Sequence, residues 1–180
     1  MIAAAADSMS VSFGLAMLAL RAVVGLYLFG HGAQKLFGWF GGSGLSGSVA
    51  MVERLGFRPA RFWGVNAALG EAGGGLLILL GLLTPLGSIS AGAAMLTAVS
   101  SVHWSKGVWA AKGGFELPLT NLAVVCAIAL VGPGAYSLDR WLGVSLPEPA
   151  TLGAVGGVVL IVTLAGLVTR TRLPSGPSRT

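Results

Sequence analysis

The chain has 180 residues, of which 54% are hydrophobic and only 9% are charged, and its mean hydropathy is +0.84. A soluble domain carries charge on roughly 25% of its residues. The composition therefore excludes a water-soluble fold and predicts an all-α membrane protein, a polytopic helical bundle. The net charge of +5 does not indicate nucleic-acid binding, because the basic residues flank apolar runs. The expected partner is the lipid bilayer.

Five apolar runs are long enough to cross the bilayer as helices. We predict these spans at residues 11–29, 62–83, 86–102, 117–131 and 152–168. Residues 1–10 lack the positive charge of a secretory signal and are expected to form a short extracytoplasmic N-terminus. The second span stops at Thr84-Pro85, since proline cannot continue a helix, and the fourth at Gly132-Pro133-Gly134. The predicted organisation is a four-helix unit over 11–143, then a fifth span and a short basic cytoplasmic tail within 144–180.

Basic residues are distributed unequally between the two sides that these spans define. With the N-terminus outside, the outer segments hold only Arg140. The inner segments hold Lys35, Arg54, Arg58, Arg61, Lys106, Lys112, Arg170, Arg172 and Arg179. Because cytoplasmic loops carry an excess of Lys and Arg, we predict a cytoplasmic (inner) membrane protein with its N-terminus outside and its C-terminus inside. Residues 45–55, in the first inner loop, could form a short interfacial helix.

Two ionisable residues lie well inside predicted spans, where charge is costly and is usually paired or functional. Arg21 lies in the first span and Glu71 in the second. At 1.5 Å per residue, each is about 14 Å from the predicted inner end of its helix. We therefore hypothesise a buried Arg21–Glu71 ion pair, which either locks two helices together or has a functional role.

A second polar group gathers at the inner ends of the first, third and fourth spans. Its members are His31, Gln34, Lys35, His103, Trp104, Glu116 and Asn121. Antiparallel threading brings them to one membrane depth, and the first three share a helix face if the first helix continues that far. Such a polar pocket, open toward the inner leaflet, suits a quinone. The quinone carbonyls need donors such as His or Lys, and its tail can lie among apolar helices.

Each member of this group also has a structural interpretation. The lysines can be topology charges, and Trp104 fits an aromatic belt at the membrane interface. His31 and His103 could instead ligate a haem or another metal. With two histidines and a single cysteine, Cys126, that alternative is weaker, and we predict no metal site. Phosphate-binding loops, dinucleotide fingerprints and nucleophile elbows are absent from the sequence.

Four segments occur in order along the chain: RAVVGLYLFGHGAQKLFGWFGG, LGEAGGGLLILLGLLTPLG, VHWSKGVWAAKGGFELPL and GPGAYSLDRWLG. Together they resemble the DoxX family of small membrane proteins. The resemblance covers roughly residues 21–143 and includes Asp139 besides the polar residues already named. It implies an inner-membrane helical bundle associated with quinone-linked oxidation, including thiosulfate-to-quinone electron transfer in related subunits, and with thiol handling beside soluble partner enzymes.

The leading prediction is a membrane subunit of a quinone-linked redox system of the thiosulfate or thiol type. The candidate catalytic residues, for proton handling, are Glu71, His31 and Glu116. The candidate substrate-binding residues are Arg21, Gln34, Lys35, His103, Trp104 and Asn121. The electron donor would sit on another membrane or soluble redox protein. One alternative is a non-catalytic anchor of a larger complex. A small-solute transporter is less favoured, because no inverted repeat is visible.

Overall fold

The computed structural model describes residues 2–146 and 148–170 of the chain. Within them the chain forms helices α1 (Ile2–Phe37), α2 (Gly44–Arg54), α3 (Ala60–Leu80), α4 (Thr84–Ala98), α5 (Glu116–Val131), α6 (Leu138–Leu142) and α7 (Glu148–Thr169). No strand occurs in this part of the chain. The predicted all-α class is therefore confirmed.

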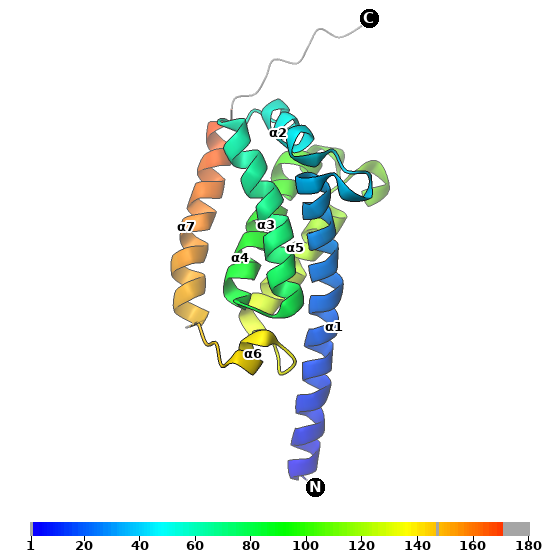
Figure 1. Cartoon of the computed structure of the whole chain (residues 1–180), viewed down its shortest axis with the longest axis vertical. Coiled ribbons are helices and arrows are strands. Elements are labelled where there is room, and N and C mark those ends of the chain that lie inside the picture. Colours follow the sequence, from blue (N-terminus) through cyan, green and yellow to red (C-terminus); the bar gives the residue numbers. More distant parts are fainter. Residues whose placement is uncertain (1, 147, 171–180) are drawn as a thin grey trace, which may run out of the picture.

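Helices α1, α3, α4 and α5 form the core of the bundle, and α7 packs against α4 on its outside (Figure 1). The short helix α2 lies at the end of the bundle where α1 stops and α3 starts, and α6 lies at the opposite end. Buried residues from four helices meet in the centre, among them Leu28, Ile78, Ala91 and Ile128. The prediction of a four-helix core with a fifth, C-terminal helix is confirmed.

Four segments of the described chain are long and apolar enough to cross a membrane: Ser10–Phe37, Ala60–Leu80, Thr84–Lys106 and Ala150–Thr169. Helix α5 is also apolar but has only 16 residues. At 1.5 Å per residue it is about 24 Å long, somewhat less than the roughly 30 Å of a hydrocarbon core. The protein is a multi-pass membrane protein. Helix α4 itself has 15 residues, but helical segments continue it to Lys106, so α5 is the shortest continuous helical run of the core.

Among the helix boundaries that differ from the sequence prediction, three affect the packing: the end of α1, the end of α3 and the start of α4. Helix α1 runs to Phe37, eight residues beyond its predicted end at residue 29. Helix α3 stops at Leu80 because Gly81 adopts the left-handed conformation (φ 61°) that closes a helix. Pro85 then stands in the first turn of α4, where its missing N–H costs nothing. Glycine, rather than proline, ends the second span.

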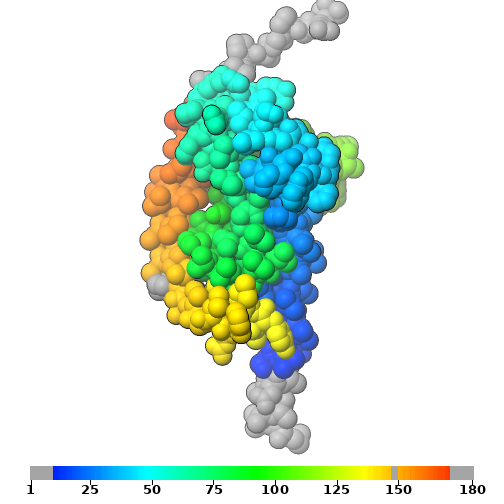
Figure 2. All heavy atoms as spheres, in the orientation of Figure 1, coloured from blue at the N-terminus to red at the C-terminus, as the bar shows by residue number. Residues whose placement is uncertain are grey.

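The predicted interfacial helix is present as α2, which begins at Gly44 and ends at Arg54. In Figure 2 this segment, coloured light blue to cyan, covers one end of the bundle. Lys35 lies near the end of α1 at the same end of the molecule, and Arg61 lies near the start of α3. This clustering agrees with the predicted inner face. Its orientation in the membrane stays a prediction, and residues 171–180, with Arg172 and Arg179, lie outside the described chain.

Small residues allow close contact between neighbouring helices. A Cβ added to Gly25 of α1 would lie 2.6 Å from the main-chain nitrogen of Leu79, and one added to Gly74 of α3 would lie 2.8 Å from that of Ala91. Neither position tolerates a larger side chain without moving a helix. Gly70 also lies close to α4, because a Cβ added there would be 3.3 Å from the main-chain oxygen of Ser90. Gly153, on α7, has nothing within 4 Å of an added Cβ, so close packing does not occur there.

Candidate functional site

A polar cluster joins α1 to the end of the bundle where α6 lies. Arg21 is fully buried, and its Nη2 donates to the main-chain carbonyl of Tyr136. It also interacts electrostatically with Asp139. Asp139 accepts hydrogen bonds from the main-chain N–H groups of Leu83 (2.7 Å) and Thr84 (3.0 Å) and from the Thr84 hydroxyl (2.7 Å). The GPGAYSLDRWLG segment thus clamps α1 to the turn between α3 and α4.

The predicted ion pair between Arg21 and Glu71 is wrong. Glu71 instead pairs with Lys35, which lies 14 residues further along α1 (35 minus 21), or about 21 Å along the helix axis. The depth estimate failed because it assumed that the first helix ended near residue 29. The additional eight residues of α1 shift its inner end by about 12 Å. Arg21 is consequently level with Gly81, at the far end of α3.

A cavity of about 970 Å³ lies toward the end of the bundle that carries α2. Helices α1, α2, α3, α4, α5 and α7 all contribute to its wall. Of the predicted site residues, His31, Gln34, Lys35, Glu71, His103 and Asn121 line it. Arg21, Trp104 and Glu116 are not among its lining residues. The apolar face of α7 closes one side through Val158, Val159 and Val162, with Thr163 beside them.

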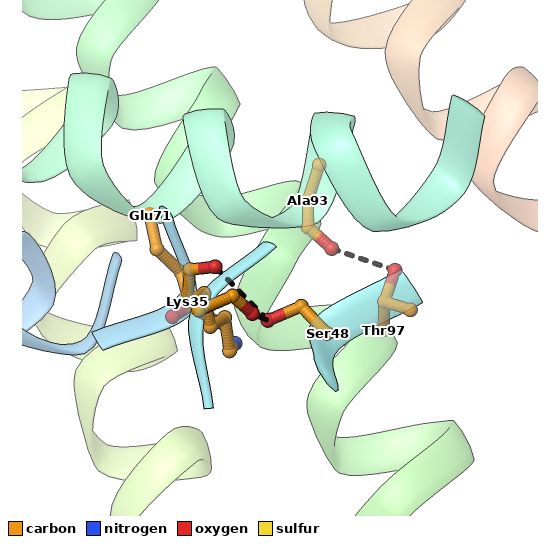
Figure 3. A network of polar contacts seen from close by, with 6 residues as sticks. Lys35, Ser48, Glu71, Ala93 and Thr97 are labelled. Atoms are coloured by element: carbon orange, nitrogen blue, oxygen red, sulfur yellow. Dashed lines mark hydrogen bonds and ion pairs between the residues drawn. The ribbon is translucent and has the colours of Figure 1, made fainter. Parts of the chain in front are cut away.

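The Lys35–Glu71 ion pair is the most buried charged group on the cavity wall (Figure 3). Glu71 is 3% exposed, whereas the Lys35 side chain is 33% exposed. Lys35 bonds Oε1 of the carboxylate, and Oε2 has no hydrogen-bond partner among the described residues. Ser48 of α2 bonds the main-chain carbonyls of Lys35 (3.1 Å) and Gly44 (2.9 Å). This contact ties α2 over the end of α1, next to the ion pair.

A widened turn brings His103 to the cavity. Helix α4 continues as a π-helical segment, Val99–His103, a geometry that often marks functional sites. His103 Nδ1 lies 2.7 Å from the main-chain oxygen of Gly113. His31 lies on the α1 side of the same cavity, with its ring centroid 4.5 Å from that of Tyr27. Among the described residues no group of three or more His, Cys, Asp or Glu side chains is placed to hold a metal ion.

Two of the predicted residues organise the loop behind His103. Glu116 accepts a hydrogen bond at Oε2 from the main-chain N–H of Ala110 (2.8 Å). Trp104 is 65% exposed, and its ring stacks on Phe115 with centroids 5.1 Å apart. Both residues hold the segment that follows α4 in place and so shape one wall of the cavity.

Several polar residues on the cavity wall were not selected from the sequence. They include Ser48, Asn66, Ser90, Thr97 and Thr163. A detectable pattern existed for two of them, because the seven-residue spacing of Ser90 and Thr97 places both on one helix face. Thr163 is a buried polar residue of the largely apolar α7. Its position facing the cavity follows only from how α7 packs on α4.

The fold and this cavity define a class: a small multi-pass helical membrane protein with a partly buried ion pair on the wall of a ligand-sized cavity. The family model described as DoxX matches residues 16–104, from the first turns of the α1 span to the segment after α4. The chain belongs to the DoxX family through this segment. The first two of the four resembling segments lie within it, and the last lies beyond it. Neither the curated proteins nor the solved structures gave a match.

Proposed function

We propose that this protein is a membrane subunit of a quinone-linked redox system and that the cavity binds the quinone. The observation that carries this proposal is the Lys35–Glu71 pair on the wall of the 970 Å³ cavity. Buried charges in membrane helices are rare and mark binding sites or proton paths. The membership of the DoxX family, many of whose members are linked to quinone-related redox reactions, supports the same reading.

The size and polarity of the cavity suit a ring with an apolar tail. Ligand pockets commonly measure about 300–1,000 Å³ and combine apolar walls with a few polar groups. Here the ionisable side chains lie on α1, α3 and the segment after α4, whereas α7 contributes mainly valines. A quinone ring would lie at the polar side, and its isoprenoid chain would lie along α7 and the lipid.

In this proposal Glu71 and His31 handle the protons that accompany reduction or oxidation of the ring, because both line the cavity and both can gain or lose a proton. Glu116 contributes indirectly, through the loop that it holds. With one cysteine, Cys126, and two histidines in the sequence, we propose that electrons are exchanged with a partner membrane or soluble redox protein.

Quinone binding to the purified protein tests the proposal directly. We expect menaquinone or ubiquinone to bind wild-type protein, and Glu71→Gln and His31→Ala to weaken that binding. Glu53→Gln is the matched control, since Glu53 pairs with Arg58 at 2.5 Å, is about half exposed and is not a cavity residue. Binding no stronger than to empty detergent micelles would refute the proposal. If a stoichiometric partner co-purified in that case, the anchor alternative would replace it.

A further inference from the structure

The side chains on the cavity wall have already used hydrogen-bond donors within the protein. Thr97 donates its hydroxyl proton to Ala93 (Figure 3), Asn66 Nδ2 donates to Phe62, and both acceptors are main-chain carbonyls. The same holds for further lining residues: Gln34 to Phe40, Ser48 to Gly44 or Lys35, and His103 to Gly113. Lys35 also gives one N–H to Glu71. These residues keep free acceptor atoms for a ligand, and the amides of Gln34 and Asn66 also keep one N–H each.

The two most important of these free acceptors belong to Glu71 and His103. Oε2 of Glu71 is buried without a partner among the described residues, although the residue lines the cavity. A main-chain carbonyl can only accept, so His103 Nδ1 must carry the proton that bonds Gly113. In the neutral imidazole, Nε2 is then an acceptor. A buried carboxylate oxygen without a donor is costly, so a donor on the ligand would be strongly favoured.

Several donors remain on the cavity wall, among them the hydroxyls of Tyr27, Ser90 and Thr163, a ring N–H of His31 and the ammonium of Lys106. Lys35 keeps two N–H groups, but its side chain is 33% exposed and its charge is balanced by Glu71. Asn121 lines the cavity from α5, and its amide can donate or accept. Pro118, also on α5 and on the wall, has no N–H. Among the groups on the cavity wall, Oε2 of Glu71 is the buried atom without a hydrogen-bond partner among the described residues, and it is an acceptor.

A quinone and its quinol differ in whether they can donate a hydrogen bond to such an acceptor. The quinone presents two carbonyl oxygens, which only accept, whereas the quinol has gained two electrons and two protons and presents two hydroxyl groups, which donate. We propose that the cavity is selective for the quinol, and that one quinol hydroxyl bonds Oε2 of Glu71. This inference rests on the proposed function and specifies which redox state the site stabilises.

Selective binding of the reduced form changes the redox properties of the bound couple. A hydrogen bond to a charged acceptor is strong enough for a preference of at least about tenfold. A tenfold preference for quinol raises the two-electron midpoint potential of the bound couple by about 30 mV relative to the free couple. The bound ligand is consequently easier to reduce than the same molecule in the lipid.

The test compares decylubiquinone with decylubiquinol, handled without oxygen, on full-length protein in lipid nanodiscs. We expect wild-type protein to bind the quinol at least about tenfold more tightly than the quinone. In Glu71→Gln the ratio of the two affinities should fall toward one, because the amide offers a donor as well as an acceptor. Glu53→Gln, the same chemical change outside the cavity, should leave the ratio at its wild-type value.

The possible outcomes separate this inference from the proposed function. If wild-type protein binds neither form, the proposed function fails. If it binds both equally, or the quinone more tightly, quinone binding stands and quinol selectivity is overturned. A quinol preference that Glu71→Gln leaves unchanged overturns the role of the carboxylate. Should that variant fail to fold, the ratio measured on wild-type protein still decides whether the site is selective.

Discussion

Replacing Asp139 with alanine should destabilise the fold while leaving the cavity intact. The substitution removes the acceptor of three hydrogen bonds from the start of α4. It also leaves the fully buried Arg21 without the carboxylate that balances its charge. The affected groups lie at the end of the bundle where α6 packs, far from the Lys35–Glu71 pair.

The expected loss can be bounded from these contacts. A lost helix cap costs about 0.5–2 kcal/mol, and removing one partner of a buried charge pair costs about 3–5 kcal/mol. The two contributions share Asp139 and are not additive, so we expect a total loss of about 3–5 kcal/mol. Adding Arg21→Met to Asp139→Ala should recover part of this loss, because the unpaired charge is then gone.

Reversible unfolding in mixed detergent micelles measures the loss of stability. Quinone affinity, measured under conditions in which the variant is folded, shows whether the cavity is intact. We expect affinity within about twofold of wild type, because Arg21 is about 21 Å from Lys35 along α1. Glu53→Ala, which breaks an exposed pair, should cost at most about 1 kcal/mol. An Asp139→Ala protein as stable as Glu53→Ala would refute the stabilising role of the Asp139 contacts. Loss of quinone binding in folded Asp139→Ala protein would refute the claim that the Asp139 cluster and the cavity are independent.

Three further predictions concern packing, the ion pair and the cavity wall. Gly74→Val should prevent α3 from packing on α4 and lower the yield of folded protein. Gly73→Val should be tolerated, because nothing lies within 4 Å of an added Cβ there. Monodispersity on size-exclusion chromatography distinguishes the two variants. Lys35→Met should cost about 3–5 kcal/mol in the same unfolding assay, since a buried carboxylate loses its partner. Val159→Trp should reduce quinone affinity at least about tenfold by filling the cavity. Ile161→Trp, on the exposed side of α7, should not.

The class of fold could be predicted because it depends on local properties of the sequence. Long apolar runs separated by glycine, proline and charge indicate membrane helices whatever their packing. The short helix α2 was also predictable from a local pattern, because Met51 and Leu55 fall on one side of a helix and Glu53 and Arg54 on the other. Its place at the membrane interface stays a prediction. The end of α1 was not predictable, because its last turns, with His31 and Lys35, are polar enough to resemble a loop. They are helical because α3 packs beside them, with Gly32 against Ala72.

The cavity could be predicted only in part. His31, Gln34 and Lys35 follow one another at helical spacing, and this pattern placed them together correctly. Pairing between helices depends on the relative height of two segments, and an error of eight residues in one boundary moved the partner of Glu71 from Lys35 to Arg21. The contribution of α7 depends on tertiary packing alone, so its sequence contains no pattern that would reveal it.

The difference between the two buried acids, Asp139 and Glu71, explains why binding is assigned to one end of the molecule. Both oxygens of Asp139 accept hydrogen bonds from the main chain and side chain at the start of α4, so this acid needs no donor from a ligand. Arg21 beside it keeps Nε and Nη1 without partners among the described residues, but it does not line the cavity. Glu71 has a buried oxygen without a partner among the described residues, and it also lines the cavity. A ligand can therefore satisfy Glu71, whereas the cluster around Asp139 can only hold helices together.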